Sequence, residues 1–187
     1  MSQSLRLPKR IFGLLILLLL TGVVWAEELQ PDSFQGLKLG QKVPNFELTD
    51  LKGKSFRLYD FLNSGNFVLI NFWATWCPPC LQELPSMELL NQSFKGEAFS
   101  ILAISVDEKT QDVVNFMNQI GERSLSFLVL LDPLKLVSQA QFGTQKYPES
   151  FLIGPDRVLL EKYIGERNWM DSKIVSQLKE LMSKKNQ

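Results

Sequence analysis

Residues 71–80 read Asn-Phe-Trp-Ala-Thr-Trp-Cys-Pro-Pro-Cys, and this stretch decides the fold. It overlaps the end of an apolar run, residues 67–72, that shows no polar–apolar alternation and is therefore typical of a strand buried on both faces. Residues 78–94 then carry apolar side chains at helical spacing. The two prolines suit a first helical turn, where a missing N–H costs no hydrogen bond. The stretch predicts a buried strand followed by a helix that begins at the first cysteine.

Cys77 and Cys80 are the only cysteines in the chain, so their spacing has to be explained as a pair. At the start of a helix, free backbone N–H groups and the helix dipole stabilise a thiolate, which lowers the pKa of Cys77. Cys80 lies one turn later on the same face, within bridging reach and deeper. We therefore predict that Cys77 attacks a substrate disulfide and that Cys80 resolves the mixed disulfide.

A structural disulfide and a zinc site account less well for the cysteine pair. A disulfide across two residues closes a very short loop and constrains little of the unfolded chain, so it is a poor structural staple. Zinc needs about four ligands, and the chain has no histidine and no further cysteine. The lack of histidine also excludes Ser-His-Asp and Cys-His catalysis. The sequence predicts a redox-active Cys77–Cys80 disulfide that needs no metal and no cofactor.

The length of 187 residues predicts one domain, and the charge balance bears on its partners. Twenty Lys and Arg stand against twenty Asp and Glu, so there is no basic excess to bind a phosphate backbone. We expect no nucleic-acid partner, and we expect a monomer.

The amino-terminal segment has the layout of a secretory signal. Arg6, Lys9 and Arg10 precede an apolar run from residue 11 to 25, and small residues around Ala26 offer a cleavage site. The run is shorter than the ~20 residues that span a bilayer comfortably, but an uncleaved anchor remains an alternative. We expect residues 1–26 to be a signal peptide or an uncleaved membrane anchor, residues 27–40 a tether, and residues 41–187 the domain. The domain would then lie in the periplasm or cell envelope, free after cleavage or anchored to the inner membrane.

The remaining patterns alternate strands with helices, which indicates an α/β protein with a mixed central sheet. Thr110 is expected to cap one helix, and Asn168 another that runs from about Trp169 to Lys184. The other expected elements are a hairpin over residues 45–49 and 55–58, strands at 99–106 and 127–131, a short helix at 134–142, and a hairpin over 150–153 and 158–164.

Trp-Cys-Pro-Pro-Cys after a hydrophobic strand resembles the thioredoxin superfamily, specifically its exported TlpA/ResA/CcmG-like thiol–disulfide oxidoreductases. The resemblance covers about residues 41–187 and implies a thioredoxin-like fold with helices flanking the sheet, an N-terminal β-hairpin and a central helix–strand insertion. Further matches are residues 43–46 with their hairpin (an entry that peroxiredoxins share), Pro85 as the kink proline of the active-site helix, residues 107–131 as the insertion, and Tyr147-Pro148-Glu149-Ser150-Phe151 as the cis-proline loop.

The resemblance also implies roles for single residues. Glu83, three residues after Cys80, matches a family glutamate, and the same spacing turns it toward the dithiol. A solvated first-turn acid is the alternative for Glu83. Asn71 stands where thioredoxins place a buried Asp, and it cannot transfer protons. The expected docking residues are Trp76, as an exposed lid, Tyr147 and Pro148 through their backbone, and Glu149, as a specificity residue.

The function implied is an exported protein disulfide reductase. Its clients would be exported proteins with disulfides, such as apocytochrome c, and a membrane electron-donor protein would recharge it. A disulfide oxidase or isomerase, a thiol peroxidase, and a redox-inert binding module or metal chaperone remain as alternatives.

Overall fold

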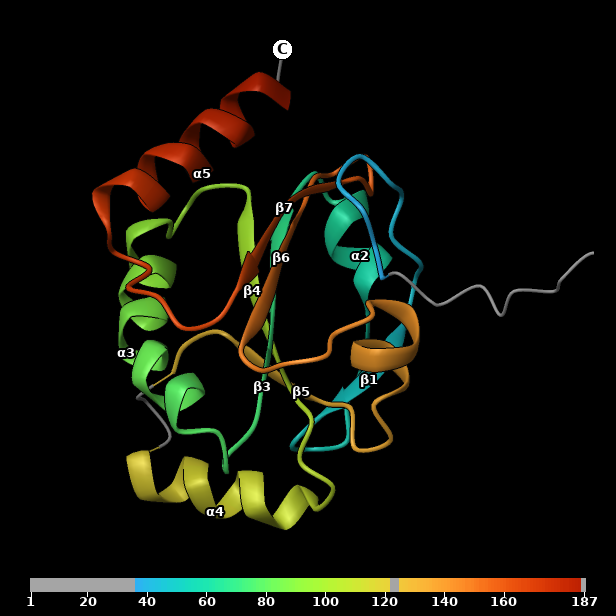
Figure 1. Ribbon diagram of the computed structural model, residues 1–187, viewed down its shortest axis with the longest axis vertical. Coiled ribbons are helices and arrows are strands. Elements are labelled where there is room, and N and C mark those ends of the chain that lie inside the picture. Colours follow the sequence, from blue (N-terminus) through green and yellow to red (C-terminus); the bar gives the residue numbers. More distant parts are fainter. Residues whose placement is uncertain (1–35, 122–124, 186–187) are drawn as a thin grey trace, which may run out of the picture. The chain divides into compact units, whose positions relative to one another are not determined.

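The structure is a computed structural model, and it describes residues 36–121 and 125–185 (Figure 1). The predicted signal or anchor, residues 1–26, and residues 27–35 of the predicted tether lie outside the described residues. The last residues of that tether contact the domain, because the Leu37 N–H donates to the Phe142 carbonyl (3.4 Å) and the Gly40 N–H to the Leu159 carbonyl (2.9 Å). In residues 36–121 and 125–185, no helix is long and apolar enough to cross a membrane.

A seven-stranded mixed sheet forms the centre of the domain, with the strand order β2-β1-β5-β4-β3-β6-β7. β3 pairs in parallel with β4, and β4 with β5, whereas the other neighbours are antiparallel. This confirms the predicted α/β class. The strands are β1 (Glu47–Asp50), β2 (Ser55–Arg57), β3 (Phe67–Trp73), β4 (Phe99–Ser105), β5 (Leu128–Leu131), β6 (Glu149–Ile153) and β7 (Leu159–Ile164).

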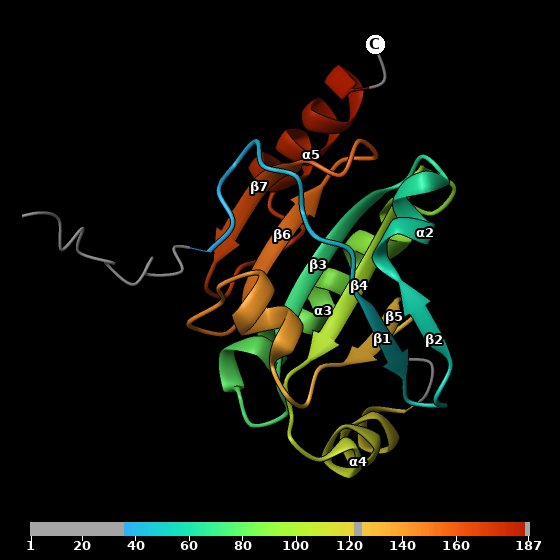
Figure 2. The same cartoon turned by 90° about the vertical axis from the view of Figure 1, so that its right-hand side faces the viewer.

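Helices cover both faces of the sheet. α3 and α5 lie against one face and α2 and the short π-helix η1 against the other, while α4 lies beyond the end of the sheet at which β4 ends (Figures 1 and 2). The helices are α2 (Leu58–Asn63), α3 (Pro78–Ser93), α4 (Thr110–Ile120), η1 (Leu136–Gln141) and α5 (Ser172–Lys185).

β3 occupies the middle of the core, and every one of its residues is buried. This confirms the strand that the run without polar–apolar alternation predicts, because β3 is paired on both edges and covered on both faces. On the face of η1, the rings of Phe72, Phe142 and Phe151 meet edge to face at centroid distances of 5.0–5.7 Å. Each such ring pair contributes about 0.5–1.5 kcal/mol beyond the area that it buries.

The predicted N-terminal hairpin and the helix–strand insertion are both present, and they bind each other. β1 pairs with β2 across a tight turn, and on its other edge β1 pairs with β5, with Thr49 opposite Leu131. Among the residues that the structure describes, the hairpin therefore joins the sheet through the inserted strand β5 alone.

Three element boundaries differ from the predictions. α2 was not predicted, because residues 55–58 read as a strand, and the strand ends at Arg57. Lys109, without a side-chain bond, caps α4, so Thr110 is its first helical residue and the cap prediction is wrong by one position. The helix expected over residues 134–142 is the shorter π-helix η1, in which the Phe142 N–H reaches back five residues to the Val137 carbonyl (3.0 Å).

The predicted start of the last helix is also wrong, and the segment that precedes the helix takes part in the candidate site described below. The Asn168 carboxamide accepts the Met170 N–H (3.0 Å), which closes a separate turn before the helix. The Asp171 carboxylate accepts the Lys173 N–H (2.8 Å), and α5 begins at Ser172. Trp169 lies inside the first of these turns and its side chain is fully buried, so this residue belongs to a loop that enters the core.

Candidate active site

Cys77 and Cys80 form a disulfide at the amino end of α3, with their Cα atoms 5.3 Å apart. Cys77 occupies the N-cap, and its Sγ accepts the Cys80 N–H at 3.3 Å. Cys77 is 5% exposed and Cys80 is fully buried. The first cysteine is thus the nearer of the two to solvent and lies at the positive end of the helix dipole.

The loop before Cys77 is fixed by a buried acid that the sequence analysis missed. Asp107 is 2% exposed, and its carboxylate accepts the Thr75 N–H (3.0 Å), the Thr75 hydroxyl (2.6 Å) and the Ser105 hydroxyl (2.7 Å). The Cys77 N–H closes the loop by donating to the Ala74 carbonyl (3.2 Å). The sequence signal was an acid placed directly after a buried parallel strand, at the same sheet edge as the cysteines.

Trp76 projects from this loop, with 59% of its surface exposed. Its ring meets that of Tyr147 edge to face at 6.1 Å, and the Tyr147–Pro148 peptide bond is cis. The Pro148 carbonyl accepts the Gly165 N–H (2.9 Å), which ties the proline loop to the end of β7. Three of the predicted docking residues therefore lie together beside the cysteine loop.

Glu149 is placed differently. It is 5% exposed and pairs with Lys162, whose Nζ lies 2.9 Å from Oε1. The same Nζ lies 5.0 Å from the ring of Phe151. Side chains alternate along β6, so Glu149 and Phe151 share the face of η1 and Ser150 points to the face of α3. The carboxylate of Glu149 thus lies on the sheet face opposite Glu83.

Glu83 is 1% exposed, which excludes the solvated first-turn acid. Its Oε1 accepts a bond from Asn71 Nδ2 at 2.7 Å, and its Oε2 accepts bonds from Trp169 Nε1 and from the Arg167 backbone N–H, both at 3.3 Å. Burial raises the pKa of Glu83 to about 7, against the smaller lowering effects of these hydrogen bonds and of the Arg167 charge. Glu83 is therefore able to exchange a proton near neutral pH.

The loop between β7 and α5 supplies two of those donors, and the sequence analysis missed both. The apolar spacing predicts a helix from about Trp169, whereas in the structure Asn168 closes a turn around this residue. The backbone N–H of Trp169 also donates to the Ser86 hydroxyl on α3 (3.1 Å), and its ring contacts that of Tyr163 (5.3 Å). The guanidinium of Arg167 lies 4.8 Å from the Tyr163 ring. The loop thus holds Glu83 from the side away from β3.

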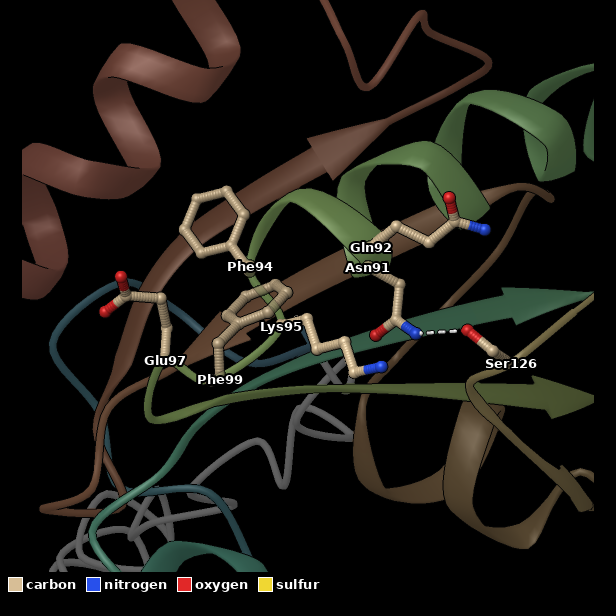
Figure 3. Close-up of a pocket in the computed structure, with 8 residues that line it drawn as sticks. Asn91, Gln92, Phe94, Lys95, Glu97, Phe99 and Ser126 are labelled. Atoms are coloured by element: carbon tan, nitrogen blue, oxygen red, sulfur yellow. Dashed lines mark hydrogen bonds between the residues drawn. The ribbon is translucent and has the colours of Figure 1, made fainter.

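The hollow shown in Figure 3 has a volume of about 670 Å³ and lies at the other end of α3. Asn91 and Ser126 are hydrogen-bonded on its wall (2.8 Å), and its lining holds no cysteine. It is therefore separate from the disulfide chemistry. The residues that the structure describes include no cluster of three or more Cys, His, Asp or Glu able to bind a metal ion.

The family model that matches this chain is that of the AhpC/TSA family, over residues 39–162. The chain belongs to the AhpC/TSA family. Among its family relatives, the thiol-disulfide oxidoreductase ResA of Bacillus thuringiensis (strain Al Hakam) is 37% identical over 159 residues, which cover 84% of this chain and 88% of the relative. ResA of Bacillus subtilis (strain 168) is 35% identical over 131 residues and covers 70% of each chain.

Solved structures agree with this family assignment. The crystal structure of a putative thiol:disulfide interchange protein DsbE from Chlorobium tepidum has a TM-score of 0.69 and 31% identity, and the match covers 78% of this chain and 99% of that one. A putative thioredoxin from Neisseria meningitidis gives 0.64 and 33% over 76% of this chain and 91% of that one. The fold is thioredoxin-like, and this AhpC/TSA-family protein is a thiol–disulfide oxidoreductase.

Proposed function

We propose that this protein is exported and reduces disulfides of client proteins. The observation that carries the proposal is the cysteine pair at the start of α3 with the buried Glu83 one turn further on. The reduced pair holds two electrons to give, and Glu83, with a pKa near 7, is able to accept a proton at the pH at which exchange occurs.

The reaction begins when the thiolate of Cys77 attacks one sulfur of a client disulfide. The client S–S bond breaks, a Cys77–client bond forms, and the released client thiolate takes a proton from water. Cys80 then gives its proton to the Glu83 carboxylate and attacks Cys77 Sγ, which releases the second client thiolate. Two electrons pass to the client, and the Cys77–Cys80 disulfide remains.

Docking is the proposed role of the residues around the cysteine loop. Trp76 offers an exposed ring, and the backbone of Tyr147 and Pro148 runs beside it. Glu149, next in the chain, would influence client preference through its ion pair with Lys162 rather than by direct contact with Glu83.

Export and the reducing direction belong to the same proposal. Residues 1–26 would act as a signal peptide or an inner-membrane anchor, residues 27–40 as a tether and residues 41–187 as the thioredoxin-like domain, which would work in the periplasm or cell envelope. That compartment is oxidising, so a membrane electron-donor protein would have to reduce the disulfide after each turnover. Exported proteins such as apocytochrome c, whose thiols must be free, are the clients that fit this activity. The protein would act as a monomer.

Trapping tests the client proposal directly. Without Cys80 the mixed disulfide cannot be resolved, so Cys80→Ala expressed in cells should accumulate on the client through Cys77. Cys77→Ala is the matched control and should trap nothing. Limiting iodoacetamide should label Cys77 before Cys80 in the reduced protein, and preferential labelling of Cys80 would reverse the two roles.

The direction and the compartment need separate measurements. A reduction potential below about −250 mV supports a reductant, whereas one near about −120 mV supports an oxidase. Peroxide consumption by the purified protein alone would favour the thiol peroxidase, and stoichiometric Cu(I) binding the metal chaperone. Alkaline phosphatase fused after residue 187 should be active, and a stable but inactive fusion would contradict export.

A further inference from the structure

The two oxygens of Glu83 have different kinds of partner. Oε2 faces the indole N–H of Trp169 and the backbone N–H of Arg167, which only donate. Oε1 faces the side-chain amide of Asn71, which donates from Nδ2 and accepts at Oδ1. The present arrangement, with donors at both oxygens, suits an ionised Glu83.

A protonated Glu83 has to donate a hydrogen bond, and the donors at Oε2 cannot receive it. Asn71 Oδ1 is an acceptor that has no hydrogen-bond partner among the described residues, although the side chain is fully buried. Rotation of the amide therefore breaks no bond at Oδ1 and brings this oxygen toward Glu83 Oε1.

Ser150 permits the same rotation. Its hydroxyl now accepts a second bond from Asn71 Nδ2 (2.9 Å), and a hydroxyl accepts or donates with equal ease. Once Oδ1 takes the place of Nδ2, the Ser150 hydroxyl turns and donates to it. In the present orientation no described residue donates to Oδ1, so Glu83 and Ser150 are the groups that decide which orientation is adopted.

We propose that Asn71 is a positioning residue whose side-chain amide rotates by half a turn when Glu83 takes up a proton. Nδ2 donates to the carboxylate, and Oδ1 accepts from the carboxylic acid. Both forms of Glu83 then keep a hydrogen bond at Oε1. The consequence for turnover rests on the proposed role of Glu83: the proton taken from Cys80 is held between Oε1 and Asn71 until it leaves.

The other charged and titratable groups around Glu83 do not compete for this role. Arg167 stays cationic, and burial raises the pKa of Tyr163 to about 12, so Tyr163 is neutral throughout. Cys77 and Cys80 do not titrate as a disulfide. The chain has no histidine, the side chain that ordinarily titrates near neutral pH, so a side-chain titration near pH 7 in the oxidised protein is expected from Glu83.

NMR of the oxidised protein, purified from cells that express the full chain, tests the rotation. The ¹³C shift of the Glu83 carboxyl reports its protonation, and the Asn71 NH₂ signals should shift with the same midpoint. Strong nuclear Overhauser effects between the Asn71 NH₂ and Ser150 Hβ should be present above the midpoint and lost below it. Unchanged effects on both sides of a Glu83 titration would overturn the proposal.

Two variants serve as controls. Glu83→Gln removes the carboxyl group that titrates, so the Asn71 signals should become independent of pH. Glu88→Gln, on the same helix, should leave the titration of the Asn71 signals unchanged. Ser150→Ala replaces the hydroxyl by a methyl group that still reports the orientation of the Asn71 amide. The Overhauser effect from Asn71 NH₂ to that methyl should still be lost at low pH. No step of the test uses a client, so a failed rotation leaves the proposed reductase activity intact, and a failed reductase assay leaves the rotation intact.

Discussion

Glu83 and Glu88 lie five residues apart on α3, and both are buried, with 1% and 7% of their surface exposed. Glu88 accepts three short hydrogen bonds, from the Ser126 N–H (2.7 Å), the Ser126 hydroxyl (2.6 Å) and Gln92 Nε2 (2.8 Å). Glu83 accepts one of 2.7 Å and two of 3.3 Å. Both carboxylates thus have three donors, but all three bonds to Glu88 are short, whereas two of the three bonds to Glu83 are long.

The difference between the two acids teaches that burial alone does not mark a functional carboxylate. Glu88 binds Gln92 and Ser126, which line the hollow of Figure 3, and so fixes the segment that leads into β5; these partners fit a structural role. Glu83 lies one turn after Cys80, and its hydrogen bonds lower its pKa by less than burial raises it. Substitutions at the two acids and at their neighbours test this division.

The largest effect is expected on the rate of disulfide exchange. Glu83→Gln removes the proton acceptor for Cys80, so reduction of a client disulfide should slow by about 10²- to 10³-fold. Loss of the negative charge should also lower the thiol pKa of Cys80. In the parent, the rate should fall as the pH drops through about 7, because protonated Glu83 accepts no proton. Stopped-flow rates across pH measure this, and Glu88→Gln should stay within about twofold.

Substitutions at the same two glutamates should change the free energy of unfolding in opposite directions. The pKa of Glu83 is higher in the folded protein than in the unfolded chain, so its stabilising contribution is complete below about pH 4.5 and is lost as the pH rises through about 7. Glu83→Gln should therefore stabilise the oxidised protein at pH 8, by up to about 3 kcal/mol.

Glu88→Ala should instead destabilise by about 1–3 kcal/mol, because it leaves the buried partners of Glu88 unpaired. Urea unfolding of both variants at pH 5 and pH 8 gives the comparison. Equal destabilisation by the two variants at pH 8 would mean that Glu83 is a structural acid like Glu88.

A second carboxylate at Asn71 should move the titration of Glu83. In Asn71→Asp, two carboxyl groups would face each other across the present 2.7 Å contact and share one proton. The pH midpoint of the exchange rate should rise by about one unit or more. Asn71→Ser, which removes the amide without adding charge, is the matched variant, and a midpoint shift of the same size there would show that the second charge is irrelevant.

The smallest effect is expected at the docking surface. Trp76→Ala removes an exposed ring beside the cysteine loop and should raise the KM for a client about fivefold with little change in kcat. Leu89→Ala removes a similarly exposed apolar side chain, 54% against 59%, from the far part of α3. If both substitutions change KM alike, the surface near the disulfide has no special part in docking.

The sequence predicted the parts of the molecule whose pattern is local. The largely apolar run of residues 67–72 predicted β3, the Cys-Pro-Pro-Cys motif predicted the start of α3, and spacing placed Glu83 one turn after Cys80. The sequence pattern did not reveal contacts between segments that lie far apart in the chain. Asp107 binds Thr75 from the end of another strand, and Trp169 reaches Glu83 from a loop near the other end of the chain. No periodicity connects such residues, because tertiary packing brings them together.

The attachment of the β1–β2 hairpin through β5 has a consequence for the order of folding. The hairpin lies near the start of the domain's sequence, whereas β5, which it pairs with through Thr49 and Leu131, lies much later in the sequence. Bringing such distant segments together costs chain entropy before the pairing repays it, so contacts of this kind form late. The hairpin should therefore be among the last parts to gain protection from hydrogen exchange during refolding, after β3, β4 and α3 have formed the centre of the domain.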